Sequence, residues 1–130
     1  MRIAIIGLIV MGFISCKAQE KYSDQVVHLD VVSFSKMLNE KDIQLIDVRT
    51  PTEYANGHVK DAKLIDYKAG DFKNKAFEGL DSEKPVLLYC ASGRRSARAA
   101  KMYVDAGFKK VYNLVGGFRA WKAENLKIVQ

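Results

Sequence analysis

A run of four apolar residues, Val86-Leu87-Leu88-Tyr89, constrains the fold of this chain more than any other feature. A strand that shows no alternation with polar residues is buried on both faces, which is typical of a parallel sheet covered by helices on both sides. The residues that follow, Cys90 to Arg95, are small or charged, and an alanine-rich helix is predicted from Ser96 to Ala106. This order of strand, loop and helix predicts an α/β fold.

The rest of the body repeats this alternation of strands and helices. Further strands are predicted at Val26 to Leu29, Ile43 to Val48, Ala62 to Ile65 and Val111 to Leu114. Helices are predicted after an N-cap at Asp30, at a capping box of Thr50 and Glu53, from Asp71 to Leu80, and after Gly116-Gly117. The alternation favours one domain with a largely parallel central sheet.

The composition agrees with a single globular domain and excludes some functions. The chain has 130 residues, of which 48% are hydrophobic and 28% are charged. Its formal net charge is +6, but the basic residues are spread along the chain. No zinc-ligand spacing and no basic helix interleaved with aromatic residues is found, which argues against a nucleic-acid-binding module. The positive charge is interpreted as a solvated surface, with attraction to small anions or an anionic membrane as the alternative.

The N-terminal segment has the pattern of an export signal. Arg2 is followed by an apolar run that ends at Ile14, as in the basic and apolar regions of a secretory signal. The run is too short to span a membrane, which takes about 20 apolar residues. It ends in Phe13-Ile14-Ser15-Cys16, which resembles a bacterial lipoprotein cleavage box, where the cysteine thiol is lipidated.

We therefore expect three parts in the chain. Residues 1–15 are predicted to be a lipoprotein-type signal peptide, residues 16–25 a flexible tether, and residues 26–130 the folded domain. Cys16 would carry a lipid, so that the protein is exported and anchored to a membrane of the bacterial cell envelope, facing the periplasm. The alternative is a buried N-terminal strand or helix that contains a cysteine by chance.

Cys90 is the candidate for chemistry. It lies after a buried strand and before a helix, where unpaired backbone amides and the helix dipole favour negative charge. Gly93 permits a tight turn, and Arg94 and Arg95 add positive charge. These features predict a thiol pKa below the free value of about 8.5 and hence a nucleophilic thiolate. The alternative is a small buried side chain at the end of a strand.

Two classes of reaction use a cysteine in such a loop. Tyrosine-type phosphatases need five residues between the cysteine and an arginine, which would place the arginine at position 96. That position is Ser96, and Arg95 comes one residue early. The loop therefore favours the other class, in which the thiolate accepts a sulfane sulfur, although a phosphatase or arsenate reductase stays as a further alternative.

Three groups of residues, taken together, resemble the motifs of the rhodanese family. They span roughly residues 26–125 in the order that the family shows. The groups are Leu45-Ile46-Asp47-Val48-Arg49 with Glu53-Tyr54 and Gly57-His58, then Tyr89 to Ser96, and then Gly107-Phe108 with Leu114 to Phe118 and Trp121.

The resemblance implies a fold and an active site. The fold would be a rhodanese-like α/β domain with a five-stranded, mostly parallel central sheet and helices on both faces. Cys90 would carry a persulfide, and no metal or organic cofactor is implied. The six-residue loop from Cys90 to Arg95 is similar to that of the family's sulfurtransferases. The substrate-binding residues would be Ala91, Ser92, Gly93, Arg94, Arg95 and Ser96.

Four further motif residues are expected to be structural. Asp47 and Arg49 are predicted to form an ion pair, with substrate contact as the alternative. His58 is interpreted as a hydrogen-bonded scaffold residue, with a general base as the alternative. Glu53 belongs to the same motif.

The function predicted from these residues is sulfur transfer. A small anionic donor such as thiosulfate would charge Cys90, and a thiol or cyanide would remove the sulfur. An alternative with the same loop is a persulfide-carrying module that shows little turnover by itself and is charged by a sulfur-relay protein partner.

Overall fold

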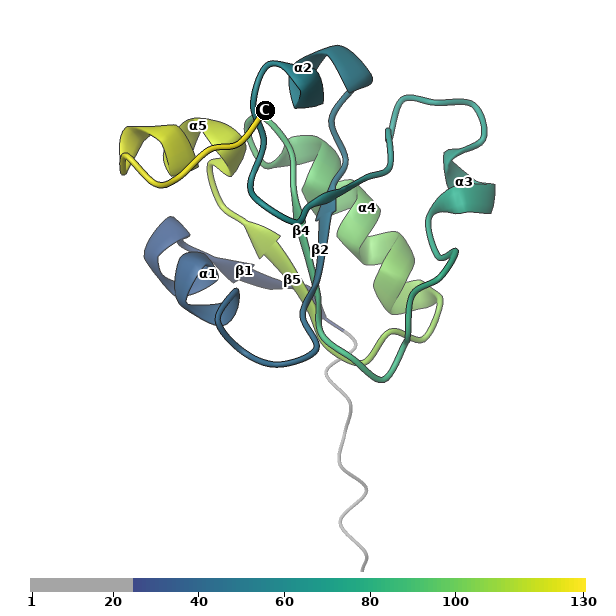
Figure 1. The fold of residues 1–130 in the computed structure, drawn as a ribbon. Coiled ribbons are helices and arrows are strands. Elements are labelled where there is room, and N and C mark those ends of the chain that lie inside the picture. The colour runs from purple at the N-terminus through teal and green to yellow at the C-terminus, as the bar shows by residue number, and fades with distance from the viewer. Residues whose placement is uncertain (1–24) are drawn as a thin grey trace, which may run out of the picture.

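The computed structural model describes residues 25–130 (Figure 1). Cys16, the predicted signal peptide and nearly all of the predicted tether lie outside the described residues. The strands are β1 (Val27–Leu29), β2 (Gln44–Asp47), β3 (Lys63–Leu64), β4 (Val86–Tyr89) and β5 (Val111–Leu114). The helices are α1 (Val31–Met37), α2 (Pro51–Ala55), α3 (Phe72–Lys75), α4 (Arg94–Asp105) and α5 (Gly117–Ala123).

The five strands form one sheet in the order β1-β5-β4-β2-β3, and each pair of neighbours is parallel. The predicted parallel sheet is therefore confirmed. The apolar strand β4 lies in the middle, and all four of its residues are buried. Because parallel strands end at the same edge of a sheet, Cys90 follows β4 at the edge where α/β proteins bind ligands.

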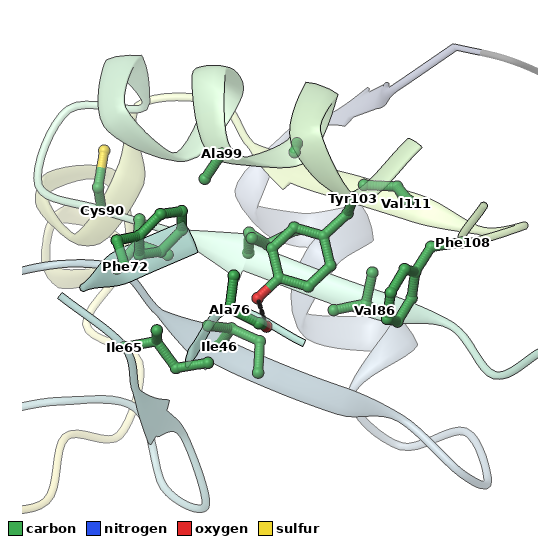
Figure 2. Close-up of a cluster of buried hydrophobic side chains, with 13 residues drawn as sticks. Ile46, Ile65, Phe72, Ala76, Val86, Cys90, Ala99, Tyr103, Phe108 and Val111 are labelled. Carbon is green, nitrogen blue, oxygen red and sulfur yellow. Dashed lines mark hydrogen bonds between the residues drawn. The ribbon is translucent and has the colours of Figure 1, made fainter. Parts of the chain in front are cut away.

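Helices cover both faces of the sheet, as predicted (Figure 1). Successive strand residues point to opposite faces. On one face, Val86 and Leu88 of β4 pack with Ala99 and Tyr103 of α4. Figure 2 shows Val86, Ala99 and Tyr103 in this cluster. On the other face, Leu87 and Tyr89 pack with residues of α1 and α5, among them Phe34, Phe118 and Trp121.

Local sequence explains where most helices begin. The Asp30 side chain accepts a hydrogen bond from the Ser33 amide at 2.7 Å and starts α1. The capping box of Thr50 and Glu53 is present at α2. Helix α4 begins at Arg94, two residues before the predicted start, because Gly93 takes a left-handed conformation with φ of 99° and turns the chain into the helix.

The helix predicted from Asp71 to Leu80 is wrong in length. Only Phe72–Lys75 is helical, and turns follow in which the Glu78 and Leu80 amides donate to the carbonyl oxygens three residues earlier. Gly79 has φ of 70°, which cannot continue a right-handed helix. The segment is nevertheless held to α4, because the Tyr103 hydroxyl donates a hydrogen bond to the Ala76 carbonyl (Figure 2).

Candidate active site

The sulfur of Cys90 lies at the N-terminal end of α4, within hydrogen-bond distance of Gly93 and Ser96. The residue is 1% exposed, and its Sγ accepts a hydrogen bond from the Gly93 amide at 3.0 Å. The buried hydroxyl of Ser96 donates a second hydrogen bond to Sγ at 3.3 Å. The loop therefore curls around the sulfur, with donors that lie three and six residues further along the chain.

Two opposing effects act on the thiol. Burial alone would raise the pKa of Cys90, because a buried thiolate loses its hydration. The Ser96 hydroxyl and the backbone amides of Ser96, Gly93 and Ser92 act in the opposite direction, since they donate hydrogen bonds to the anion. Their sum outweighs burial, so the pKa of Cys90 lies below its ordinary value. The predicted preference for thiolate thus has its main source in hydrogen bonds.

The first turn of α5 is hydrogen-bonded to the backbone of the Cys90 loop. The Phe118 amide donates to the Cys90 carbonyl at 2.7 Å, and the Arg119 amide donates to the Ala91 carbonyl at 3.2 Å. Gly117 makes this approach possible, because a Cβ atom there would lie 2.5 Å from the Cys90 carbonyl oxygen. Sequence reasoning took the Gly116-Gly117 pair as a turn and missed this contact, although a double glycine before a helix was the available signal.

Asp47, the last residue of β2, forms the expected ion pair with Arg49. Both are buried, and the Arg49 Nη2 lies 2.8 Å from the Asp47 Oδ2. The same nitrogen donates to the Gly57 carbonyl at 2.7 Å, and the guanidinium lies 4.1 Å from the ring centre of Phe118. Arg49 thus joins the end of β2 to the segment after α2 and to α5.

His58 makes its contacts with α2. Its Nδ1 lies 3.0 Å from the Tyr54 carbonyl oxygen, and its ring stacks on the Tyr54 ring with centroids 3.6 Å apart. These contacts agree with a scaffold role. They give no support to a role as the base of Cys90.

Arg95 is held by Glu53. Its Nη1 and Nη2 donate to the two carboxylate oxygens at 2.8 and 2.9 Å. The hydrogen bonds from Arg95 lower the pKa of Glu53 to about 2, although partial burial opposes this. Arg94, the other predicted anion-binding arginine, is exposed at the first position of α4. Sequence reasoning did not pair Glu53 with Arg95, because 42 residues separate them.

The Rhodanese-like domain family matches residues 30–124 of this chain. The chain belongs to the rhodanese family. The match covers β2 to β5, the Cys90 loop, and helix α5, whose amides bind the loop. Among residues 25–130 of this rhodanese, no group of three or more His, Cys, Asp and Glu side chains is placed to hold a metal ion. No helix in that range is long and apolar enough to cross a membrane.

Its relatives include named sulfurtransferases. The thiosulfate sulfurtransferase GlpE of Coxiella burnetii is 37% identical over 102 residues, which cover 78% of this chain and 89% of the relative. The protein of the same name from Vibrio cholerae is 35% identical over 106 residues, covering 81% and 96%. The solved structure of the polysulfide-sulfur transferase homodimer from Wolinella succinogenes is 38% identical, with a TM-score of 0.68 and coverage of 83% and 80%. These relatives support a sulfurtransferase.

Proposed function

We propose that this rhodanese moves a sulfane sulfur from a donor such as thiosulfate to a thiophilic acceptor through a persulfide on Cys90. The observation that carries the proposal is the pair of hydrogen bonds to Cys90 Sγ, from the Gly93 amide and the Ser96 hydroxyl. They favour a thiolate at the start of a helix, which is the nucleophile that the reaction needs.

The reaction has two displacement steps. In the first, the Cys90 thiolate attacks the outer sulfur of thiosulfate, a sulfur–sulfur bond forms, and sulfite leaves with the electron pair of the broken bond. In the second, cyanide or a thiolate attacks the outer sulfur of the persulfide, and the Cys90 thiolate leaves. Each step starts and ends with a sulfur anion in the loop, so the same amide and hydroxyl donors stabilise both states.

The loop geometry supports sulfur transfer over phosphate chemistry. Ser96 stands where a tyrosine-type phosphatase has its arginine, and its hydroxyl points to Cys90 Sγ. Both terminal nitrogens of Arg95 are bound to Glu53. A phosphate-binding arginine would need those nitrogens for its substrate.

Intact-mass spectrometry tests the proposal. The protein expressed from Lys17 onward retains every described residue, and it is weighed before and after incubation with thiosulfate. A gain of one sulfur, about 32 Da, that a thiol reverses would demonstrate the persulfide. Cys90→Ser should not gain mass and should lose turnover, whereas Lys101→Ala, a change on the exposed side of α4, should behave as the parent. Turnover by Cys90→Ser within tenfold of the parent would refute the mechanism.

A negative result would be informative. If no mass is gained although the protein is folded, thiosulfate does not charge Cys90, and a module that is charged by a sulfur-relay protein becomes the better hypothesis. Hydrolysis of a generic aryl phosphate, measured on the same preparation, tests the phosphatase alternative, and none is expected.

We also propose that the protein is exported and lipid-anchored through Cys16. The support is the sequence alone: Arg2, the apolar run to Ile14, and a cysteine directly after Ser15. Cells that express the full chain would be labelled with a fatty-acid analogue. The label should appear on the parent and be absent from Cys16→Ser, which should leave the membrane fraction. Equal labelling of the two proteins would contradict the proposal.

A further inference from the structure

The carboxylate of Glu53 joins two segments that are distant in the sequence. At α2, its Oε1 accepts hydrogen bonds from the Thr50 amide at 3.3 Å and from the Thr50 hydroxyl at 3.1 Å. At α4, its two oxygens accept hydrogen bonds from Arg95 at 2.8 and 2.9 Å. Because the helix cap holds the carboxylate, α2 determines where the Arg95 guanidinium lies.

Arg95 lies between Gly93 and Ser96, which both donate hydrogen bonds to Cys90 Sγ, so its charge lies near the sulfur. Its hydrogen bonds to Glu53 are the largest cause of its raised pKa, and negative charge on Cys90 adds to the effect. The ion pair is partly shielded from water, since the side chains of Arg95 and Glu53 are 18% and 32% exposed. Their charges are therefore less screened than those of a surface pair.

Asp47, Arg49 and Arg94 also lie near this edge of the sheet, as does the exposed Arg119 of α5, whose amide donates to the Ala91 carbonyl. Asp47 is paired with Arg49 in the interior, and its charge makes a smaller contribution to the raised pKa of Arg95 than Glu53 or Cys90 does. Arg94 extends into solvent at the first position of α4, where water and salt screen its charge. Glu53 is the carboxylate bonded directly to Arg95, so removing its charge would make the potential at the loop more positive.

We propose that Glu53 is a positioning residue that limits the attraction of the Cys90 loop for anionic sulfur donors, by neutralising Arg95 and holding it toward α2. This role rests on the sulfurtransferase function proposed above. Thiosulfate is a dianion, so a carboxylate near its binding site weakens its binding. Removal of the negative charge, with the shape of the side chain kept, should strengthen donor binding and favour the thiolate. If Glu53 only stabilised the fold, its replacement would neither strengthen donor binding nor increase the thiolate fraction of Cys90.

Glu53→Gln is the test, because glutamine keeps an oxygen for the α2 cap. The pH profile of Cys90 alkylation by iodoacetamide, a neutral reagent, reports the thiolate without any sulfur donor. We expect the midpoint of the alkylation profile to fall by about half a pH unit, because one partly screened negative charge near the thiolate is lost. For the same reason, the KM for thiosulfate at low salt should fall about threefold. An unchanged or raised midpoint in a folded Glu53→Gln protein would overturn the proposal.

Thr50→Ala is the matched control. It removes the hydroxyl contact to Glu53 at the cap but leaves the charge of the carboxylate in place, so it should lower stability without lowering the alkylation midpoint or the KM. A decrease of both values in Thr50→Ala equal to that in Glu53→Gln would show that loosening α2 causes the effect, and would overturn the role of the charge.

A second measurement needs no variant. Because Arg95 is neutralised, the KM of the parent for thiosulfate should rise only about twofold between low and physiological salt. A rise of more than tenfold would overturn the proposal even if Glu53→Gln failed to fold. If the parent shows no persulfide, the proposed sulfurtransferase function fails, whereas an unshifted alkylation midpoint counts against Glu53 alone.

Discussion

Replacing Gly117 by alanine should destabilise the domain through its contact with the Cys90 loop. The new Cβ atom would lie 2.5 Å from the Cys90 carbonyl oxygen and 2.7 Å from the carbonyl carbon and oxygen of Ala91. These are backbone atoms, so the loop or α5 has to move. Overpacking of this kind costs about 1–3 kcal/mol. Gly117 also has φ of 58°, and a left-handed alanine costs about 1–2 kcal/mol.

Gly107 provides the control that separates these two causes. Its φ is 93°, and a Cβ atom there would have no neighbour within 4 Å. Gly107→Ala should therefore carry the backbone cost alone, about 1 kcal/mol after the gain from a stiffer unfolded chain. Gly117→Ala should lose about 2–4 kcal/mol in all. The difference between the two variants measures the contact with the loop.

Equilibrium unfolding in urea measures both losses, with the slope of the transition checked for two-state behaviour. The alkylation profile of Cys90 is recorded alongside, because displacement of the loop should weaken the hydrogen bonds from Gly93 and Ser96 and raise the thiol pKa. If Gly117→Ala and Gly107→Ala are destabilised equally, and the profile of Gly117→Ala is unchanged, then α5 does not hold the loop as described.

Three further changes test other parts of the structure. Ser96→Ala removes a hydrogen bond that lowers the pKa of Cys90, so its alkylation midpoint should move to higher pH; an equal midpoint would contradict the role of the hydroxyl. The pKa of Glu53 is lowered from 4.5 to about 2. Its stabilisation, about 1 kcal/mol for a partly exposed pair, is full above pH 4.5 and is lost as the pH falls toward 2. Urea unfolding between these pH values should show a larger loss in the parent than in Glu53→Gln, since Asp30 and Asp71, whose pKa values are also lowered, contribute equally to both. Arg49→Met leaves the Asp47 carboxylate buried without its partner, and should cost about 3–5 kcal/mol; a loss below 1 kcal/mol by urea unfolding would refute the buried ion pair.

The elements that the sequence predicts well are those encoded by neighbouring residues. The apolar run of β4, the capping box of α2 and the alternation of strands and helices are local patterns, and the structure contains each of them. The ion pair of Asp47 and Arg49 also spans only two residues. The sequence predicts element boundaries less well, because the early start of α4 and the early end of α3 depend on the backbone conformations of Gly93 and Gly79.

The contacts that sequence reasoning missed join segments that are far apart in the chain. Glu53 and Arg95 each belonged to a recognised motif, but nothing in either motif shows that α2 lies beside the start of α4. The same holds for Gly117, whose closeness to Cys90 and Ala91 depends on how β5 and α5 pack after the loop has formed. Both the contact of Glu53 with Arg95 and that of Gly117 with the Cys90 loop depend on the three-dimensional packing of the helices.

The structure also explains how Cys90 can be reactive without a base. Burial, with 1% of the residue exposed, opposes ionisation, and His58 is engaged with Tyr54. The hydrogen bonds from Gly93, Ser96 and Ser92 therefore provide the main preference for thiolate. In the proposed mechanism these donors would serve the thiolate and the persulfide alike, whereas a base would have to gain and lose a proton in each cycle. The reaction then needs no proton transfer in the loop, and its rate should follow the thiolate fraction of Cys90 itself.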